Sequence, residues 1–118
     1  MYEIIRKLKN SPLIDGIKVI ELIDEKTFKL LKVEAYISDH SLLYIHELHT
    51  QSYQKYSYHW QNSNGELILR WDNKPHWKHL ATFPHHRHEK GEVVESHRIT
   101  IGELLETIQN RLSDLATP

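Results

Sequence analysis

The chain has 118 residues, with 15 lysines and arginines against 16 aspartates and glutamates, and a formal net charge of −1. This length suits one domain spanning residues 1–118. The absence of cysteine excludes disulfides, thiolate metal sites and a cysteine nucleophile. No apolar run approaches the roughly 20 residues of a transmembrane helix, and the N-terminus has no apolar signal core, so we expect a soluble cytoplasmic protein without a membrane partner.

A short helix is expected first, over residues 2–9. Tyr2, Ile4, Ile5 and Leu8 recur there at helical spacing, and the segment Asn10-Ser11-Pro12 stops the pattern.

Strand-like segments follow, and turn-forming residues separate them. They cover residues 17–23, 28–37, 42–49, 53–61 and 67–71. Alternation places Tyr58 on one face of its strand with Trp60, and His59 on the other. The turn at 62–65 ends in Asn-Gly, which favours a hairpin. Short connections between consecutive strands predict an antiparallel meander of four to five strands.

Glu34 and Glu47 lie inside otherwise apolar strand segments. A carboxylate in a strand is more often on the solvent-facing side, so we expect that placement. A buried one would have a raised pKa and would be a candidate general base.

Residues 72–98 show little periodicity, and we expect a long irregular loop there. The segment 70–90 holds five basic and two acidic residues, for a charge of +3, whereas 91–118 holds two basic and five acidic residues, for −3. Half of the ten histidines lie in the basic segment. A loop of this length is usually functional, and a local cationic patch suits a phosphate-bearing ligand. On charge alone, a solvated loop whose charges have no specific role is the slightly favoured alternative.

The chain ends in a helix that begins after Thr100. Thr100 and Glu103 have the spacing of a capping box, and Ile99 and Leu104 stand at the positions of a hydrophobic staple. One apolar stripe continues along the helix, formed by Ile101, Leu104, Leu105, Ile108 and Leu112. We expect this stripe to pack on the sheet. The predicted fold class is therefore α+β: a short helix, the antiparallel sheet, the His-rich loop and a closing helix.

Two groups of residues carry the candidate chemistry. Arg70 and Asp72 leave the end of a strand on one face, and Asn73 and His76 follow them. In the second group, His86 and His88 share a face if the segment is extended, while His85 and Arg87 take the opposite face. Trp71 shares its face with Leu67 and Leu69 and is expected in the core.

Three uses of these histidines remain open. Imidazoles can act as acid and base in phosphodiester cleavage, because their pKa lies near neutral pH. They can bind zinc, nickel or copper, with His76 or His79 joining His86 and His88, although the spacing matches no zinc signature. They can also be structural, bonding to loop carbonyls.

Three ordered blocks resemble the TumE-type family, whose members are toxin components of prokaryotic toxin–antitoxin pairs. The blocks are Tyr-Ser-Tyr-His-Trp-Gln, then Gly-Glu-Leu-Ile-Leu-Arg-Trp-Asp-Asn-Lys-Pro-His, then Thr-Phe-Pro-His-His-Arg-His with Glu-Val-Val-Glu-Ser after it. The resemblance implies growth inhibition that a cognate antitoxin protein relieves. By matching position, it singles out Tyr58, His59, Arg70, Asp72, Asn73, His76, His85, His86 and His88.

We therefore expect a toxin that acts on RNA as a metal-independent endoribonuclease without a cofactor. The expected catalytic residues are Tyr58, His59, His86 and His88. The expected substrate-binding residues are Arg70, Asp72, Asn73, His76, His85 and Arg87. A metal-binding hydrolase that uses His76, His86 and His88 is the first alternative, and a non-enzymatic binding protein is the second. An open sheet has edge strands, so a homodimer is compatible with this fold.

Overall fold

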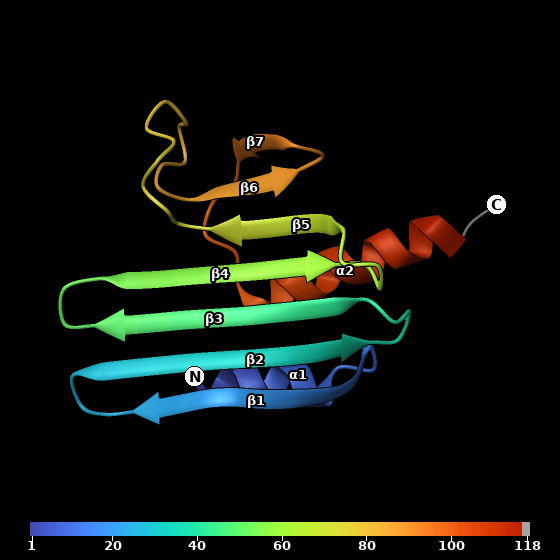
Figure 1. Cartoon of the computed structure of the whole chain (residues 1–118), viewed down its shortest axis with the longest axis horizontal. Helices are drawn as coiled ribbons and strands as arrows, with labels where there is room; N and C mark the ends of the chain where they lie inside the picture. The colour runs from blue at the N-terminus through green and yellow to red at the C-terminus, as the bar shows by residue number, and fades with distance from the viewer. Residues whose placement is uncertain (117–118) are drawn as a thin grey trace.

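Seven strands form one antiparallel sheet, and a helix at each end of the chain packs on it (Figure 1). The computed structural model describes residues 1–116. The helices are α1 (Tyr2–Asn10) and α2 (Ile101–Ala116). The strands are β1 (Ile14–Asp24), β2 (Phe28–Ile37), β3 (Leu42–Thr50), β4 (Gln54–Gln61), β5 (Leu67–Asp72), β6 (His86–Glu89) and β7 (Glu92–Glu95).

The strands lie in the sheet in the order of the chain, from β1 to β7. The predicted α+β class and the antiparallel meander are thus confirmed, but the predicted strand number of four to five is wrong. The additional strands are β6 and β7, which lie within the segment 72–98 that we expected to be irregular. Lys90 and Gly91 join them with φ values of 52° and 77°, the positive angles of a tight two-residue hairpin turn.

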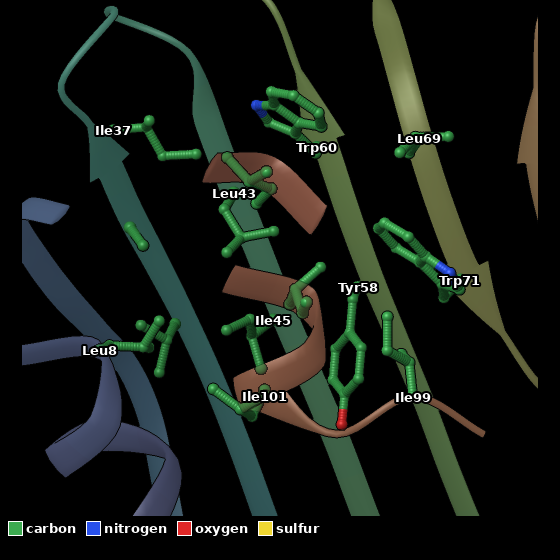
Figure 2. Packing of buried hydrophobic residues seen from close by; sticks show 14 of the residues in the cluster. Leu8, Ile37, Leu43, Ile45, Tyr58, Trp60, Leu69, Trp71, Ile99 and Ile101 are labelled. Atoms are coloured by element: carbon green, nitrogen blue, oxygen red, sulfur yellow. The ribbon is translucent and has the colours of Figure 1, made fainter. Parts of the chain in front are cut away.

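The two helices cover the same face of the sheet, which we call the covered face. In Figure 2, Leu8 of α1 and Ile101 of α2 point into a layer of side chains from β2 to β5. Trp60 and Trp71 lie in this layer, and Trp71 is buried as predicted. Alternation along each strand sends the intervening side chains to the opposite, uncovered side, which we call the open face.

The start of α2 has the predicted capping box. The Glu103 amide donates to Thr100 Oγ1, and the Thr100 amide donates to the Glu103 carboxylate, both at 3.1 Å. Ile99 and Leu104, the staple residues, are both buried. Of the apolar stripe, Ile101 and Ile108 are buried as well, so the helix packs on the sheet through the predicted residues.

Candidate functional site

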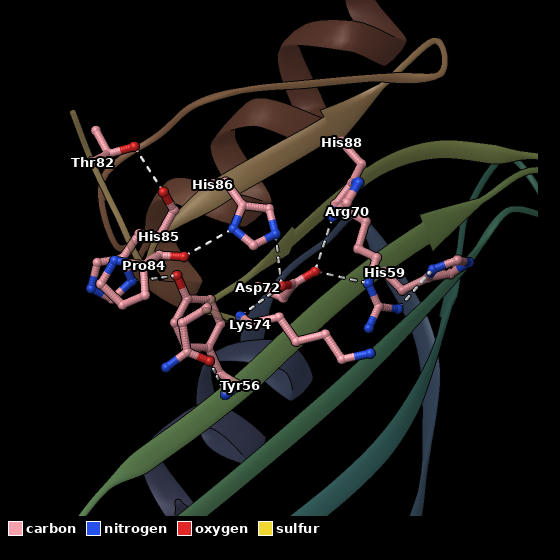
Figure 3. A network of polar contacts seen from close by, with 11 residues as sticks. Tyr56, His59, Arg70, Asp72, Lys74, Thr82, Pro84, His85, His86 and His88 are labelled. Carbon is pink, nitrogen blue, oxygen red and sulfur yellow. Dashed lines mark hydrogen bonds and ion pairs between the residues drawn. The ribbon is translucent and has the colours of Figure 1, made fainter. Parts of the chain in front are cut away.

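Charged and imidazole side chains from β4, β5 and β6 meet on the open face. Residues that pair directly across an antiparallel ladder share a face. The register pairs Arg70 with both His59 and His88, and Asp72 with His86. Figure 3 shows Arg70, His86 and His88 around the Asp72 carboxylate, with His59 beside Arg70. We call them the open-face cluster: His59, Arg70, Asp72, His86 and His88.

Asp72 lies at the centre of the cluster and is only 3% exposed. Its Oδ1 accepts a hydrogen bond of 2.9 Å from the Lys74 amide and lies 2.8 Å from His86 Nε2. Its Oδ2 lies 3.1 Å from Arg70 Nε and 3.2 Å from His88 Nε2. Burial raises the pKa of Asp72, but the Lys74 amide, His86 and Arg70 together outweigh it, so the pKa lies below its ordinary value. The carboxylate is therefore ionised at neutral pH.

His86 is the most deeply buried member of the cluster, at 1% exposure. Its Nδ1 lies 2.9 Å from the Pro84 carbonyl oxygen. Trp77, from the loop between β5 and β6, packs its ring edge-on near both His86 and His88, with centroids 6.1 and 6.3 Å away. The loop thus folds over the cluster from one side and excludes water from His86.

His88, Arg70 and His59 form the accessible side of the cluster. The His88 side chain is 27% exposed and that of Arg70 34%. Burial lowers the pKa of both His59 and His88, which favours their neutral form at pH 7. Arg70 Nη1 lies 3.3 Å from His59 Nδ1, and His59 Nε2 lies 3.1 Å from Gln61 Oε1. Gln61 and His59 together therefore orient the Arg70 guanidinium.

Hydrogen bonds from Thr82 and Asn73 hold the backbone on both sides of the loop between β5 and β6. Thr82 Oγ1 donates to the His85 carbonyl oxygen and accepts from the Ser96 amide. Asn73 bridges β5 to β4, because its Oδ1 accepts from the Tyr56 amide while its Nδ2 donates to the Gln54 carbonyl. Asn73 therefore supports the backbone beside the cluster.

Two adjoining hollows lie beside the cluster. The smaller, of about 130 Å³, includes Arg70, Asp72 and Lys74 in its lining. The larger, of about 530 Å³, includes Tyr53, His76 and Pro84. Both hollows are lined by Lys55, Asn73 and Lys74. They place two lysines next to Arg70, which is a suitable arrangement for a polyanion.

Other residues expected at the site lie away from the cluster. Tyr58 is on the covered face, where its hydroxyl donates to Glu47. His85 Nδ1 lies 2.9 Å from the Tyr56 hydroxyl, and the His85 and Tyr56 rings stack. Arg87 pairs with Trp71, on the side opposite to His86 and His88, as the alternation predicted. His76 lines only the larger hollow.

The sequence prediction that Glu47 faces solvent is wrong, because Glu47 is only 3% exposed and lies on the covered face. The Tyr58 hydroxyl donates to it at 2.9 Å, His49 Nε2 lies 2.9 Å away and Arg98 3.4 Å away. Burial and Glu47 raise the pKa of Tyr58, and burial raises that of Tyr56 to about 12. Arg98 was not anticipated, since it follows β7 and reaches Glu47 only in the folded chain.

Within residues 1–116, one group of side chains could hold a metal ion, and it consists of Asp72, His86 and His88. One ligand atom from each lies within 4.8 Å of the others. The sequence suggested His76 as the third ligand; the fold brings Asp72 to that position. Within the same described range, no helix is long and apolar enough to cross a membrane.

Comparison with known proteins identifies one family. The sequence pattern of a family described as Toxin TumE matches residues 2–115, which is nearly the whole chain. No curated protein and no solved structure matches the chain.

Proposed function

The chain belongs to the TumE toxin family, and from this premise we propose that it cleaves RNA at the open-face cluster. The observation that carries the proposal is the convergence of Arg70, Asp72 and His88 on one accessible surface. An arginine beside two imidazoles and a carboxylate supplies both a phosphate ligand and groups that transfer protons.

The reaction that suits these groups is attack of a 2′-hydroxyl on the adjacent phosphorus. The 2′-oxygen–phosphorus bond forms, the bond to the 5′-oxygen breaks, and a proton passes from the 2′-oxygen to the leaving 5′-oxygen. Arg70 stabilises the charge that develops on the phosphate. Lys55 and Lys74, which line the adjoining hollows, would bind neighbouring phosphates of the strand.

In a metal-independent mechanism, the imidazoles themselves move the proton. His88 is the best placed, because it is partly exposed and faces Asp72, which orients its ring. His59 contacts Arg70 and supports the phosphate ligand.

A second candidate, a metal-dependent hydrolase, is favoured by a different observation. Asp72, His86 and His88 have the ligand types and spacing of a metal site. In that case, these three side chains would hold the ion, which would supply Lewis-acid chemistry in place of the imidazole base.

RNA cleavage by purified protein tests the proposal. The wild type is expected to cut an RNA oligonucleotide and to leave a 2′,3′-cyclic phosphate. A 2′-deoxy substitution at the scissile nucleotide is expected to block that cut. Arg70→Ala is expected to lower the rate by about 10²–10³-fold, because it removes a preorganised charge that stabilises the transition state.

Lys78→Ala is the matched control. Lys78 is an exposed cation in the same basic segment, outside the open-face cluster. Its removal is expected to leave the rate within about twofold, which is much less than the loss of a transition-state contact. No cleavage by the wild type, or equal cleavage by Arg70→Ala, would overturn the proposal.

We also propose that the protein pairs with a cognate antitoxin, as toxin families of this kind imply. The neighbouring genes offer a direct test. A small protein encoded next to this one, often a DNA-binding protein, is expected to co-purify with it and to relieve its growth inhibition.

A further inference from the structure

His86 holds a buried nitrogen atom without a hydrogen-bond partner. Its Nδ1 faces the Pro84 carbonyl oxygen, which can only accept, so Nδ1 carries the proton. In a neutral imidazole, Nε2 then carries a lone pair. Nε2 lies 2.8 Å from Asp72 Oδ1, yet it satisfies the geometry of no hydrogen bond within the described chain.

With His86 neutral, two acceptor atoms face each other in a site shielded from water. A lone pair and a carboxylate oxygen at this distance repel each other unless a positive charge lies between them. A proton on Nε2 would make His86 the cationic partner of Asp72 in an ion pair, although the contact lacks the geometry of a hydrogen bond. A cation that both atoms coordinate satisfies them at once.

The third ligand atom is already in place. His88 Nε2 lies 3.2 Å from Asp72 Oδ2, and the ligand atoms of Asp72, His86 and His88 all lie within 4.8 Å of one another. Ligands bound about 2.1 Å from one ion lie about 3.0–3.4 Å from each other, for coordination angles between octahedral and tetrahedral. The contacts of 2.8 Å from His86 to Oδ1 and 3.2 Å from His88 to Oδ2 of Asp72 are near this range, and the whole group lies within 4.8 Å, so small side-chain shifts would bring it around one ion.

A second set of contacts holds each ligand in position. The Pro84 carbonyl fixes His86, while the Lys74 amide and Arg70 Nε hold the two oxygens of Asp72. Such outer contacts are typical of metal sites, where they set the tautomer and the orientation of the ligands. The Trp77 ring edge shields His86 and His88 from one side.

We propose that Asp72, His86 and His88 bind one divalent transition-metal ion. Two imidazoles and one carboxylate suit zinc, cobalt, nickel or copper, whereas magnesium and calcium prefer oxygen ligands throughout. Three protein ligands and a partly exposed His88 leave a coordination position open to solvent, which is the pattern of a catalytic site. The metal binding does not depend on RNA cleavage; the use of the metal in RNA cleavage rests on the metal-dependent form of the proposed function, in which His88 is a ligand and not the proton carrier.

Titration of the tag-free full chain with zinc chloride, after removal of metal with EDTA, tests the site. Calorimetry is expected to show one zinc ion per chain, and cobalt is expected to give the visible absorption of a low-symmetry nitrogen–oxygen site. Magnesium chloride is expected to give no heat of binding. A wild type that binds neither zinc nor cobalt at one equivalent would overturn the proposal.

Variants identify the ligands. His88→Ala and Asp72→Asn are each expected to weaken zinc binding by at least about tenfold, since each removes a direct ligand. His79→Ala is the matched control, because His79 is an exposed histidine of the same basic segment. His76→Ala is expected to bind zinc like the wild type. Unchanged binding by both His88→Ala and Asp72→Asn, or loss in His76→Ala, would overturn this ligand set.

Circular dichroism shows which variants are folded. If a variant is unfolded, the cobalt spectrum of the wild type still tests whether nitrogen and oxygen ligands bind the metal. The same samples separate the two proposals. Zinc binding without RNA cleavage supports the metal site and overturns the proposed function. RNA cleavage by EDTA-treated protein that binds no zinc supports the proposed function and overturns the metal site.

Discussion

The histidines of one short segment take different roles because their positions in the sheet differ. His86 and His88 alternate along β6 and reach Asp72, whereas the intervening Arg87 points to the other face. His85 precedes the strand and bonds to Tyr56. All three residues are histidines, so their different partners result from the face of the sheet on which each side chain lies and from how deeply it is buried.

We expect His46 to contribute to the pH dependence of the stability of the protein. Burial and the charges of Lys32 on β2, Lys55 on β4 and Arg70 on β5 lower its pKa below the ordinary value of 6.5, and Glu21 on β1 opposes them. The unfolded chain therefore binds more protons between the two pKa values, and the free energy of unfolding falls as the pH drops through about 6.5.

We expect the thermal unfolding midpoint of the wild type to fall from pH 7 to pH 5, and to fall less in His46→Gln. Differential scanning calorimetry across this range measures the effect. His79→Gln, at an exposed position, serves as the comparison and should keep the wild-type slope. Equal slopes in the wild type and His46→Gln would contradict the role of His46.

At the scale of elements, local patterns predicted the helices well and missed one hairpin. Both helices and the capping box at Thr100 follow from residues close in sequence. The strands β6 and β7 were missed because their residues are mostly charged or imidazole, without the apolar alternation of a half-buried strand. These residues extend because β5 offers an edge with which they can pair.

The cap of α2 gives a prediction at this scale. Thr100→Ala removes the acceptor of the Glu103 amide and is expected to lower the free energy of unfolding by about 1 kcal/mol. Urea unfolding followed by circular dichroism measures the change. Thr27→Ala, at an exposed bend between β1 and β2, is expected to change it by less than about 0.5 kcal/mol. A loss at Thr100 no larger than that at Thr27 would show that the cap does not stabilise α2.

At the scale of the whole molecule, the two helices cover one face of the sheet and leave the other face accessible. Because α1 and α2 both cover one face, the buried Glu47 and Tyr58 support packing there, and the open face keeps the accessible imidazoles (Figures 1 and 3). The open-face cluster lies on strands β4 to β6, toward the β7 edge of the sheet, and its loop shields it on one side.

Growth inhibition by the expressed protein tests the cluster in the whole molecule. Because toxicity is expected to require the cluster, Arg70→Ala and His88→Ala should relieve growth arrest while the proteins remain folded and present at wild-type levels. Lys78→Ala should arrest growth like the wild type. Plating efficiency with immunoblotting provides the measurement. Full arrest by folded Arg70→Ala and His88→Ala would instead favour a non-enzymatic toxin with structural histidines.

The sequence by itself determined the features that depend on near neighbours: the α+β class, the closing helix with its cap, and the common face of His86 and His88. Strand alternation and helix capping depend on residues only a few positions apart, so both can be predicted from the sequence. The tertiary structure alone decided that Asp72 meets His86, that Glu47 is buried and that the helices cover the face of β4 that carries Tyr58. Those contacts depend on strand register and on which face the helices cover, and both are set by packing across the whole sheet.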